Sequence, residues 1–146
     1  MNQVKHILTR KGITAVSVTP DTTVFEALKI MAEKNIGSVV VIENGKYLGI
    51  VTERDYSRKV ILKDKHSTST PVSEIMTPDL PHIAPEDSVE YCMELMTNNN
   101  IRYLPVFTNN KLGGIISITD VVKETILAQQ QTISHLESYI HSGPGL

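Results

Sequence analysis

Apolar residues recur along this chain with two different periods, and the periods alternate in a regular order. Val24, Leu28 and Met31 are spaced as on one face of a helix. Residues 38–42 form a β-branched run, which is typical of a strand buried on both faces, and Asn44-Gly45 then favours a hairpin turn. The expected elements are a strand at 15–19, a helix from 24, a strand at 38–42, a return strand at 47–52 and a helix at 54–62.

The same pattern returns 65 residues later without a gap. Of the 36 positions from 20 to 55, 11 carry the same residue as the position 65 further on, where composition alone gives about two. The second set of expected elements is a strand through Ile83, a helix at 89–96, a buried strand at 104–107, a return strand at 112–118 and a helix from about Asp120. One supersecondary unit is therefore built twice.

Two segments lie outside the repeated pattern. A short helix is expected at the start of the chain, with Val4, Ile7 and Leu8 on one side and Gly12 at its end. Residues 63–70 are polar and have no apolar period, which predicts a mobile linker between the two units.

The last helix is expected to be long and to carry a narrow apolar stripe. Ile126, Ile133 and Ile140 recur every seven residues with Leu136 between them, although Gln129 to Gln131 interrupt the stripe. The helix could pack on its own units. We favour pairing between two chains, a homodimer, because the first unit offers no counterpart to this helix.

These elements predict an α+β fold in which two β-α-β-β-α units pack as a pair, with a short N-terminal and a long C-terminal helix. With 146 residues, each unit alone would be marginally stable, so two subdomains that share one core are expected. The expected division is 1–62 for the first unit with its helix, 63–71 for the linker, 72–128 for the second unit and 129–146 for the helical tail.

Composition narrows the classes of partner. A net charge of −2 argues against nucleic acid or an anionic membrane surface, because binding phosphates needs a basic surface. No apolar run approaches the roughly 20 residues of a membrane span, and the N-terminus lacks the apolar core of a signal peptide. The single Cys92 cannot form an internal disulfide, so the cytoplasm is the expected location.

Both return strands run into a helix through one pattern: Gly, two apolar residues, Thr or Ser, two further residues and Asp. It spans 49–55 and 114–120. An Asp carboxylate can accept hydrogen bonds from both hydroxyls of a ribose, and a helix start suits phosphate. The alternative is structural, because Thr52 with Asp55, and Ser117 with Asp120, are also spaced like capping boxes.

Basic residues near these patterns suggest a phosphate contact. Arg102 stands at the mouth of the second buried strand, where the first unit has Gly37, which lets a ring approach the backbone. Arg54, Arg58 and Lys59 form a basic cluster on the helix after the first pattern. A solvated charge is the alternative at each of these basic positions.

Catalytic signatures are missing from the sequence. The five histidines show no metal-ligand spacing, and Cys92 falls on the apolar side of a helix, where a buried structural thiol is expected. Without a phosphate-binding loop or a dinucleotide-binding glycine motif, a bound nucleotide would be neither hydrolysed nor oxidised. We therefore expect neither an enzyme nor a metal site.

Taken together, the paired patterns, the strand Ile101-Arg102-Tyr103-Leu104-Pro105-Val106 and the segment Glu74-Ile75-Met76-Thr77 resemble the CBS domain, the module named after cystathionine β-synthase. The resemblance covers about residues 8–127 as a tandem pair. Thr52 to Tyr56 and the Gln-rich tail are similar to those of small bacterial proteins made of a CBS pair and little else.

The resemblance implies a pseudo-twofold disc with two clefts between the units, which bind AMP, ADP, ATP or NAD, with S-adenosylmethionine as the weaker candidate. One cleft would be lined by Thr52, Arg54, Asp55, Leu80, Ile101 and Arg102, with Arg58 and Lys59 as further phosphate contacts. The other would be lined by Ala15, Ile36, Gly37, Ser117, Thr119 and Asp120. Because only the first cleft contains basic residues, it is expected to bind phosphorylated nucleotides more tightly.

The function expected from this resemblance is a regulatory sensor, in which an adenine nucleotide changes the conformation of the pair and so the activity of a protein partner that the sequence does not identify. A ligand-free dimerisation or interaction module is the main alternative, in which Thr, Ser and Asp only cap helices. A nucleotide hydrolase is the third.

Overall fold

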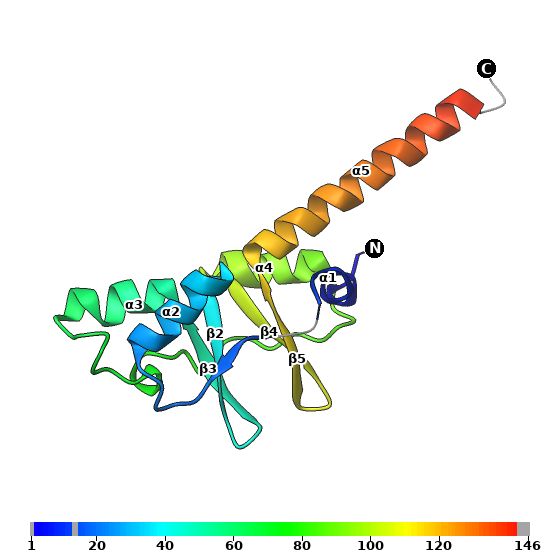
Figure 1. The fold of residues 1–146 in the computed structure, drawn as a ribbon. Helices are drawn as coiled ribbons and strands as arrows, with labels where there is room; N and C mark the ends of the chain where they lie inside the picture. Colours follow the sequence, from blue (N-terminus) through cyan, green and yellow to red (C-terminus); the bar gives the residue numbers. More distant parts are fainter. Residues whose placement is uncertain (1, 13–14, 143–146) are drawn as a thin grey trace. The chain divides into compact units, whose positions relative to one another are not determined.

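The computed structural model describes residues 2–12 and 15–142, with side chains up to residue 140. Its helices and small sheets confirm the α+β class (Figure 1). The chain divides into two compact units. The first-repeat unit consists of Thr14–Pro81 and Asn109–Gly113, and the second-repeat unit consists of Met1–Ile13, His82–Thr108 and Gly114–Leu146.

The first-repeat unit contains the complete β-α-β-β-α order. Its elements are β1 (Ser17–Val18), α2 (Val24–Lys34), β2 (Ser38–Glu43), β3 (Lys46–Thr52), α3 (Glu53–Lys59) and the short helices η1 (Ile61–Lys63) and η2 (Val72–Glu74). β2 lies in the middle of the sheet, parallel to β1 and antiparallel to β3. The expected helix at 54–62 is broken at Val60 into α3 and η1.

The second-repeat unit repeats this order with one strand reduced. Its elements are α1 (Val4–Lys11), α4 (Val89–Asn99), β4 (Tyr103–Thr108), β5 (Lys111–Ser117), which counts with this unit from Gly114 on, and α5 (Ile118–Ser142). The strand expected at Ile83 is a single parallel bridge to Val106. That bridge corresponds, at the 65-residue offset, to the pairing of Val18 with Val41 in β1 and β2.

Each repeat is completed by a segment that precedes the other repeat in the sequence. We call residues 4–11 and 72–77 the lead-in segments. Val4 and Ile7 of α1 belong to the core of the second-repeat unit, and Val72 and Ile75 belong to the core of the first-repeat unit. The division expected from the sequence, at residues 62 and 72, places each lead-in segment with the repeat that follows it. In the structure each lead-in segment packs with the other repeat.

Most buried apolar side chains of the described residues gather in two clusters, one in each unit, and the shared core expected from the sequence stays a prediction. In the first-repeat unit, Ala27 and Met31 of α2 pack with Val39 and Val41 of β2. Each cluster therefore joins helices to one face of its own small sheet. The lead-in segments add apolar side chains to both clusters.

The segment at 63–70 is tied to its unit by backbone hydrogen bonds, in contrast to the expected mobile linker. The N–H groups of Val24 and Phe25, at the start of α2, donate to the carbonyls of Thr70 and Ser67 at 2.8 and 3.0 Å. These N–H groups have no partner within the helix, so the polar segment satisfies them. Its lack of apolar period reflects this capping role.

Candidate functional site

Both candidate acids are held by reciprocal caps at the start of a helix. In the first-repeat unit the Thr52 N–H donates to Asp55 Oδ2 at 2.9 Å, and the Asp55 N–H donates to Thr52 Oγ1 at 3.1 Å. In the second-repeat unit the Ser117 N–H donates to Asp120 Oδ2 at 2.8 Å, and the Asp120 N–H donates to Ser117 Oγ at 3.1 Å. The capping interpretation is therefore confirmed for both pairs.

Capping leaves these carboxylates able to accept more. An ionised carboxylate offers about four lone-pair sites on two oxygens, and in each unit the cap uses Oδ2. The side chains of Asp55 and Asp120 are 13% and 20% exposed. Helix capping and the binding of a sugar diol are therefore compatible at the same residue.

The mouth of each buried strand lies beside the acid of the same repeat. The Glu53 N–H donates to the Gly37 carbonyl at 3.2 Å, and the Ile118 N–H donates to the Arg102 carbonyl at 2.8 Å. The backbone of Gly37 thus adjoins the start of α3, and that of Arg102 adjoins the start of α5. Both repeats build the same corner from a strand mouth, a capping hydroxyl and an acid.

A lysine already contacts each acid. Lys59, four residues after Asp55 on α3, has its Nζ 3.0 Å from Asp55 Oδ1 and donates to the Ile75 carbonyl at 2.9 Å. Lys11, at the end of α1, has its Nζ 2.8 Å from Asp120 Oδ2 and donates to the Ile115 carbonyl at 3.0 Å. In both units the ammonium group bridges the acid and a backbone carbonyl.

Lys11 corrects one premise of the sequence analysis. The region of Asp120 was expected to lack a basic residue, because Gly37 stands where the other repeat has Arg102. The structure places Lys11 directly on Asp120. Sequence reasoning missed it because the counterpart of Lys11 at the repeat offset is Met76, so no repeated pattern marks the position.

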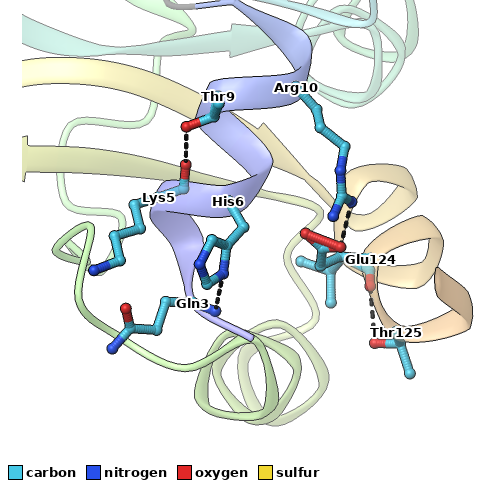
Figure 2. A network of polar contacts seen from close by, with 8 residues as sticks. Gln3, Lys5, His6, Thr9, Arg10, Glu124 and Thr125 are labelled. Atoms are coloured by element: carbon cyan, nitrogen blue, oxygen red, sulfur yellow. Dashed lines mark hydrogen bonds and ion pairs between the residues drawn. The ribbon is translucent and has the colours of Figure 1, made fainter. Parts of the chain in front are cut away.

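A second ion pair anchors α1 next to Lys11. Arg10 reaches from α1 to Glu124 of α5 and donates to Oε2 (Figure 2). The Glu124 side chain is 1% exposed, whereas that of Arg10 is 47% exposed. The repeat counterpart of Glu124 is Lys59, so the second repeat has an acid where the first has its own lysine, and α1 brings the cations instead.

The remaining predicted site residues differ in their exposure. Arg54 is half-buried, as are the apolar and small residues Ala15, Ile36, Leu80 and Ile101. The side chains of Arg58, Arg102 and Thr119 are exposed. The pairing of each acid with the strand mouth of the other repeat, which the family resemblance implies, stays a prediction.

Other chemistry is sparse in the described part of the chain. No group of three or more His, Cys, Asp or Glu residues is placed to hold a metal ion there. None of the described helices is long and apolar enough to cross a membrane. Burial, with a smaller contribution from the charge of Asp87, raises the pKa of the Cys92 thiol to about 11, so the thiol is protonated at neutral pH.

Comparison with known proteins identifies the repeated unit. The sequence model of the CBS domain matches this chain twice, at residues 4–61 and 72–126. The chain belongs to the CBS domain family. CBS domain pairs are regulatory modules that bind adenosine-containing ligands, and relatives that consist of CBS domains alone are in general not catalytic.

Individual CBS proteins are similar over most of this chain. A mitochondrial CBS domain-containing protein of Arabidopsis thaliana is 40% identical over 86% of this chain, which spans 63% of the plant protein's length. A CBS domain-containing protein from Agrobacterium tumefaciens is 39% identical, with a TM-score of 0.81 over 85% of this chain and 99% of that one. A hexameric CBS-CP12 protein from bloom-forming cyanobacteria is 33% identical, with a TM-score of 0.73 over 84% and 70%.

Proposed function

We propose that this CBS protein is a regulatory sensor that binds an adenine nucleotide, AMP, ADP, ATP or NAD, at Asp55 and Asp120. The observation that carries the proposal is the corner built twice from a strand mouth, a capping hydroxyl and a partly exposed acid. Each acid could accept the 2′ and 3′ hydroxyls of a ribose in exchange for its contact with Lys59 or Lys11. S-adenosylmethionine ranks lower, because its cationic sulfonium would approach Lys59 or Lys11.

Nucleotide binding would act on a partner by shifting a conformational equilibrium. A ligand shifts such an equilibrium only by the difference in its affinity for the two states, typically about 1–3 kcal/mol. We expect Lys59 and Lys11 to move when a ligand binds, because a sugar that hydrogen-bonds to Asp55 or Asp120 competes with the ion pair already formed there. The regulated protein would bind one of the two conformations more tightly, and its activity would follow the shift between them.

The first test separates ligand binding from helix capping with a matched pair of caps in one unit. Thr23 caps α2, accepting the Glu26 N–H at 3.2 Å, and lies outside the proposed site. Thr23→Ala and Thr52→Ala should each cost about 1 kcal/mol of stability. Only Thr52→Ala, and more strongly Asp55→Ala, should weaken AMP binding in calorimetry.

The rival module without ligand makes the opposite prediction. A nucleotide present at 100 times its dissociation constant should stabilise the wild type by about 2.7 kcal/mol in thermal unfolding. If AMP, ADP, ATP, NAD and S-adenosylmethionine all leave the melting temperature unchanged, the protein is an interaction module in which Thr52 and Ser117 only cap helices. Release of phosphate from ATP by the purified protein would instead favour the third alternative, a hydrolase.

We also propose a homodimer that forms through α5. Within its own unit, α5 runs well beyond α1 and α4 (Figure 1), and Ile126, Ile133, Leu136 and Ile140 on it are 48–59% exposed. Ile at every a position and Leu at a d position of a heptad favour a two-stranded parallel coiled coil. A second copy of this helix supplies the matching stripe.

A further inference from the structure

We propose that Lys11 makes the Asp120 site selective for phosphorylated adenosine compounds over adenosine itself. The inference rests on the proposed nucleotide function and names the residue that sets ligand choice at one of its two sites. It starts from the ion pair between Lys11 Nζ and Asp120 Oδ2, at 2.8 Å.

The ion pair fills the remaining acceptor site of the carboxylate oxygen that the cap already uses. Asp120 Oδ2 already accepts the Ser117 N–H at 2.8 Å and the Lys11 ammonium at 2.8 Å. A diol that binds both carboxylate oxygens must therefore compete with Lys11. A neutral nucleoside offers the displaced ammonium group nothing in return, and Lys11 would keep only its bond to the Ile115 carbonyl.

A phosphorylated ligand changes this balance. Its diol takes the carboxylate, and its phosphate offers the released ammonium group a new anionic partner, so one charge-assisted contact replaces another. A ligand without an anion therefore bears the full cost of breaking the ion pair. For a nucleotide, the new contact between Lys11 and the phosphate offsets most of that cost. Selectivity then comes from the cost of breaking the ion pair as much as from the new contact.

The neighbouring ion pair keeps Lys11 available. Arg10 holds the end of α1 to the buried Glu124 (Figure 2). Glu124 lies about one helical turn beyond Asp120 on α5. Because Glu124 is buried, removing its partner would leave an uncompensated charge, which makes this pair the stronger anchor. The side chain of Lys11 is 39% exposed and can exchange partners while Arg10 stays in place.

The test compares AMP with adenosine at the Asp120 site alone. In an Asp55→Asn background, which retains a capping oxygen but removes the other charge, calorimetry measures both affinities. Lys11→Met should reduce the ratio of AMP to adenosine affinity about tenfold or more, mainly by strengthening adenosine binding, because the ion pair with Asp120 no longer has to be broken. Lys11→Arg should keep the ratio, as should Lys5→Met, which removes an exposed lysine from the same helix.

Several results would overturn the inference. An unchanged ratio in Lys11→Met, repeated in Lys11→Gln in case the first variant folds poorly, would show that Lys11 does not select ligands. Equal losses for both ligands would reveal a purely structural role. If the wild type binds AMP but the Asp55→Asn protein does not, the Asp120 site is no nucleotide site, whereas failure of the wild type as well would reject the proposed function itself.

Discussion

Single residues show what the repeat preserves and why. Asn35 and Asn100 end α2 and α4 in the left-handed conformation, with φ of 53° and 52°. Asn44 and Asn109 occupy the hairpin turns with φ of 52° and 50°. Asn adopts this conformation more readily than other residues with a side chain, so these identities record backbone geometry. The sequence predicted the turns for this reason, without any tertiary information.

Gly49 and Gly114 are repeat counterparts that should respond differently to the same change. A Cβ at Gly49 would lie 2.8 Å from the Thr77 carbonyl oxygen, which is backbone, whereas one at Gly114 would meet Leu8 Cδ2 at 2.9 Å, the end of a flexible side chain. We expect Gly49→Ala to cost about 1–3 kcal/mol and Gly114→Ala clearly less. Urea unfolding of the two variants measures this, and a larger loss for Gly114→Ala would contradict it.

Cys92 gives a prediction about pH. Burial raises its pKa from 9.0 to about 11 in the folded protein, so the folded state holds the proton more tightly than the unfolded state. The resulting stability is complete below about pH 9 and is lost as the pH rises towards 11. Between pH 8 and 10.5 the wild type should lose more stability than Cys92→Ala, by on the order of 2 kcal/mol.

The Cys92→Ala variant is a matched control, because Ala27 occupies the equivalent position of the first repeat and is also fully buried. Any cavity that the change leaves contributes equally at both values of pH. Urea unfolding at each pH gives the comparison. A difference between the two proteins that does not vary with pH would show that the thiol has its ordinary pKa in the folded state.

The bounds of helices and strands could be predicted from local sequence signals, except where contacts with distant residues determine them. The helical spacing and the cap at Thr23 were sufficient for α2. The helix expected to run to Leu62 ends at Lys59, because Val60 is fully buried and η1 follows it. The hydrogen bonds from 63–70 to the start of α2 had no local signal, since their partners lie about 40 residues away.

At the level of elements, α5 provides a direct test of the dimer. Leu136→Asp would place a charge in the centre of the proposed helix pair and should give a monomer in sedimentation velocity. Gln131→Asp adds the same charge on the opposite side of the helix and should leave the dimer intact. A dimeric Leu136→Asp protein, or a monomeric wild type, would exclude pairing through this stripe.

The sequence alone did not show which segments pack together to form each unit. Periodicity showed that α1 has an apolar side with Val4 and Ile7, but spacing does not say which sheet that side covers. The structure assigns it to the second-repeat unit, where it brings Lys11 to Asp120. The acids and their capping hydroxyls were therefore predictable, and the lysine that comes from another element was not.

Removing a lead-in segment should consequently weaken the repeat that does not follow it. Deletion of residues 2–12 exposes the apolar contacts of Val4 and Ile7, so amide hydrogen exchange should accelerate in α4, β4 and β5 and change little in β2 and β3. Ile75→Ala, in the other lead-in segment, should have the reverse effect. Equal acceleration in both units after either change would contradict this.

The exchange of lead-in segments also sets an order of events during synthesis. Residues 72–77 emerge from the ribosome directly after the repeat that they complete, whereas α1 emerges before both repeats and its partner Glu124 is made more than a hundred residues later. At translation rates of about 5–20 residues per second, α1 waits roughly 5–20 s with Val4 and Ile7 unpaired. Until the second repeat is finished, the nascent chain therefore carries the apolar side of α1 uncovered, although the first repeat is already complete.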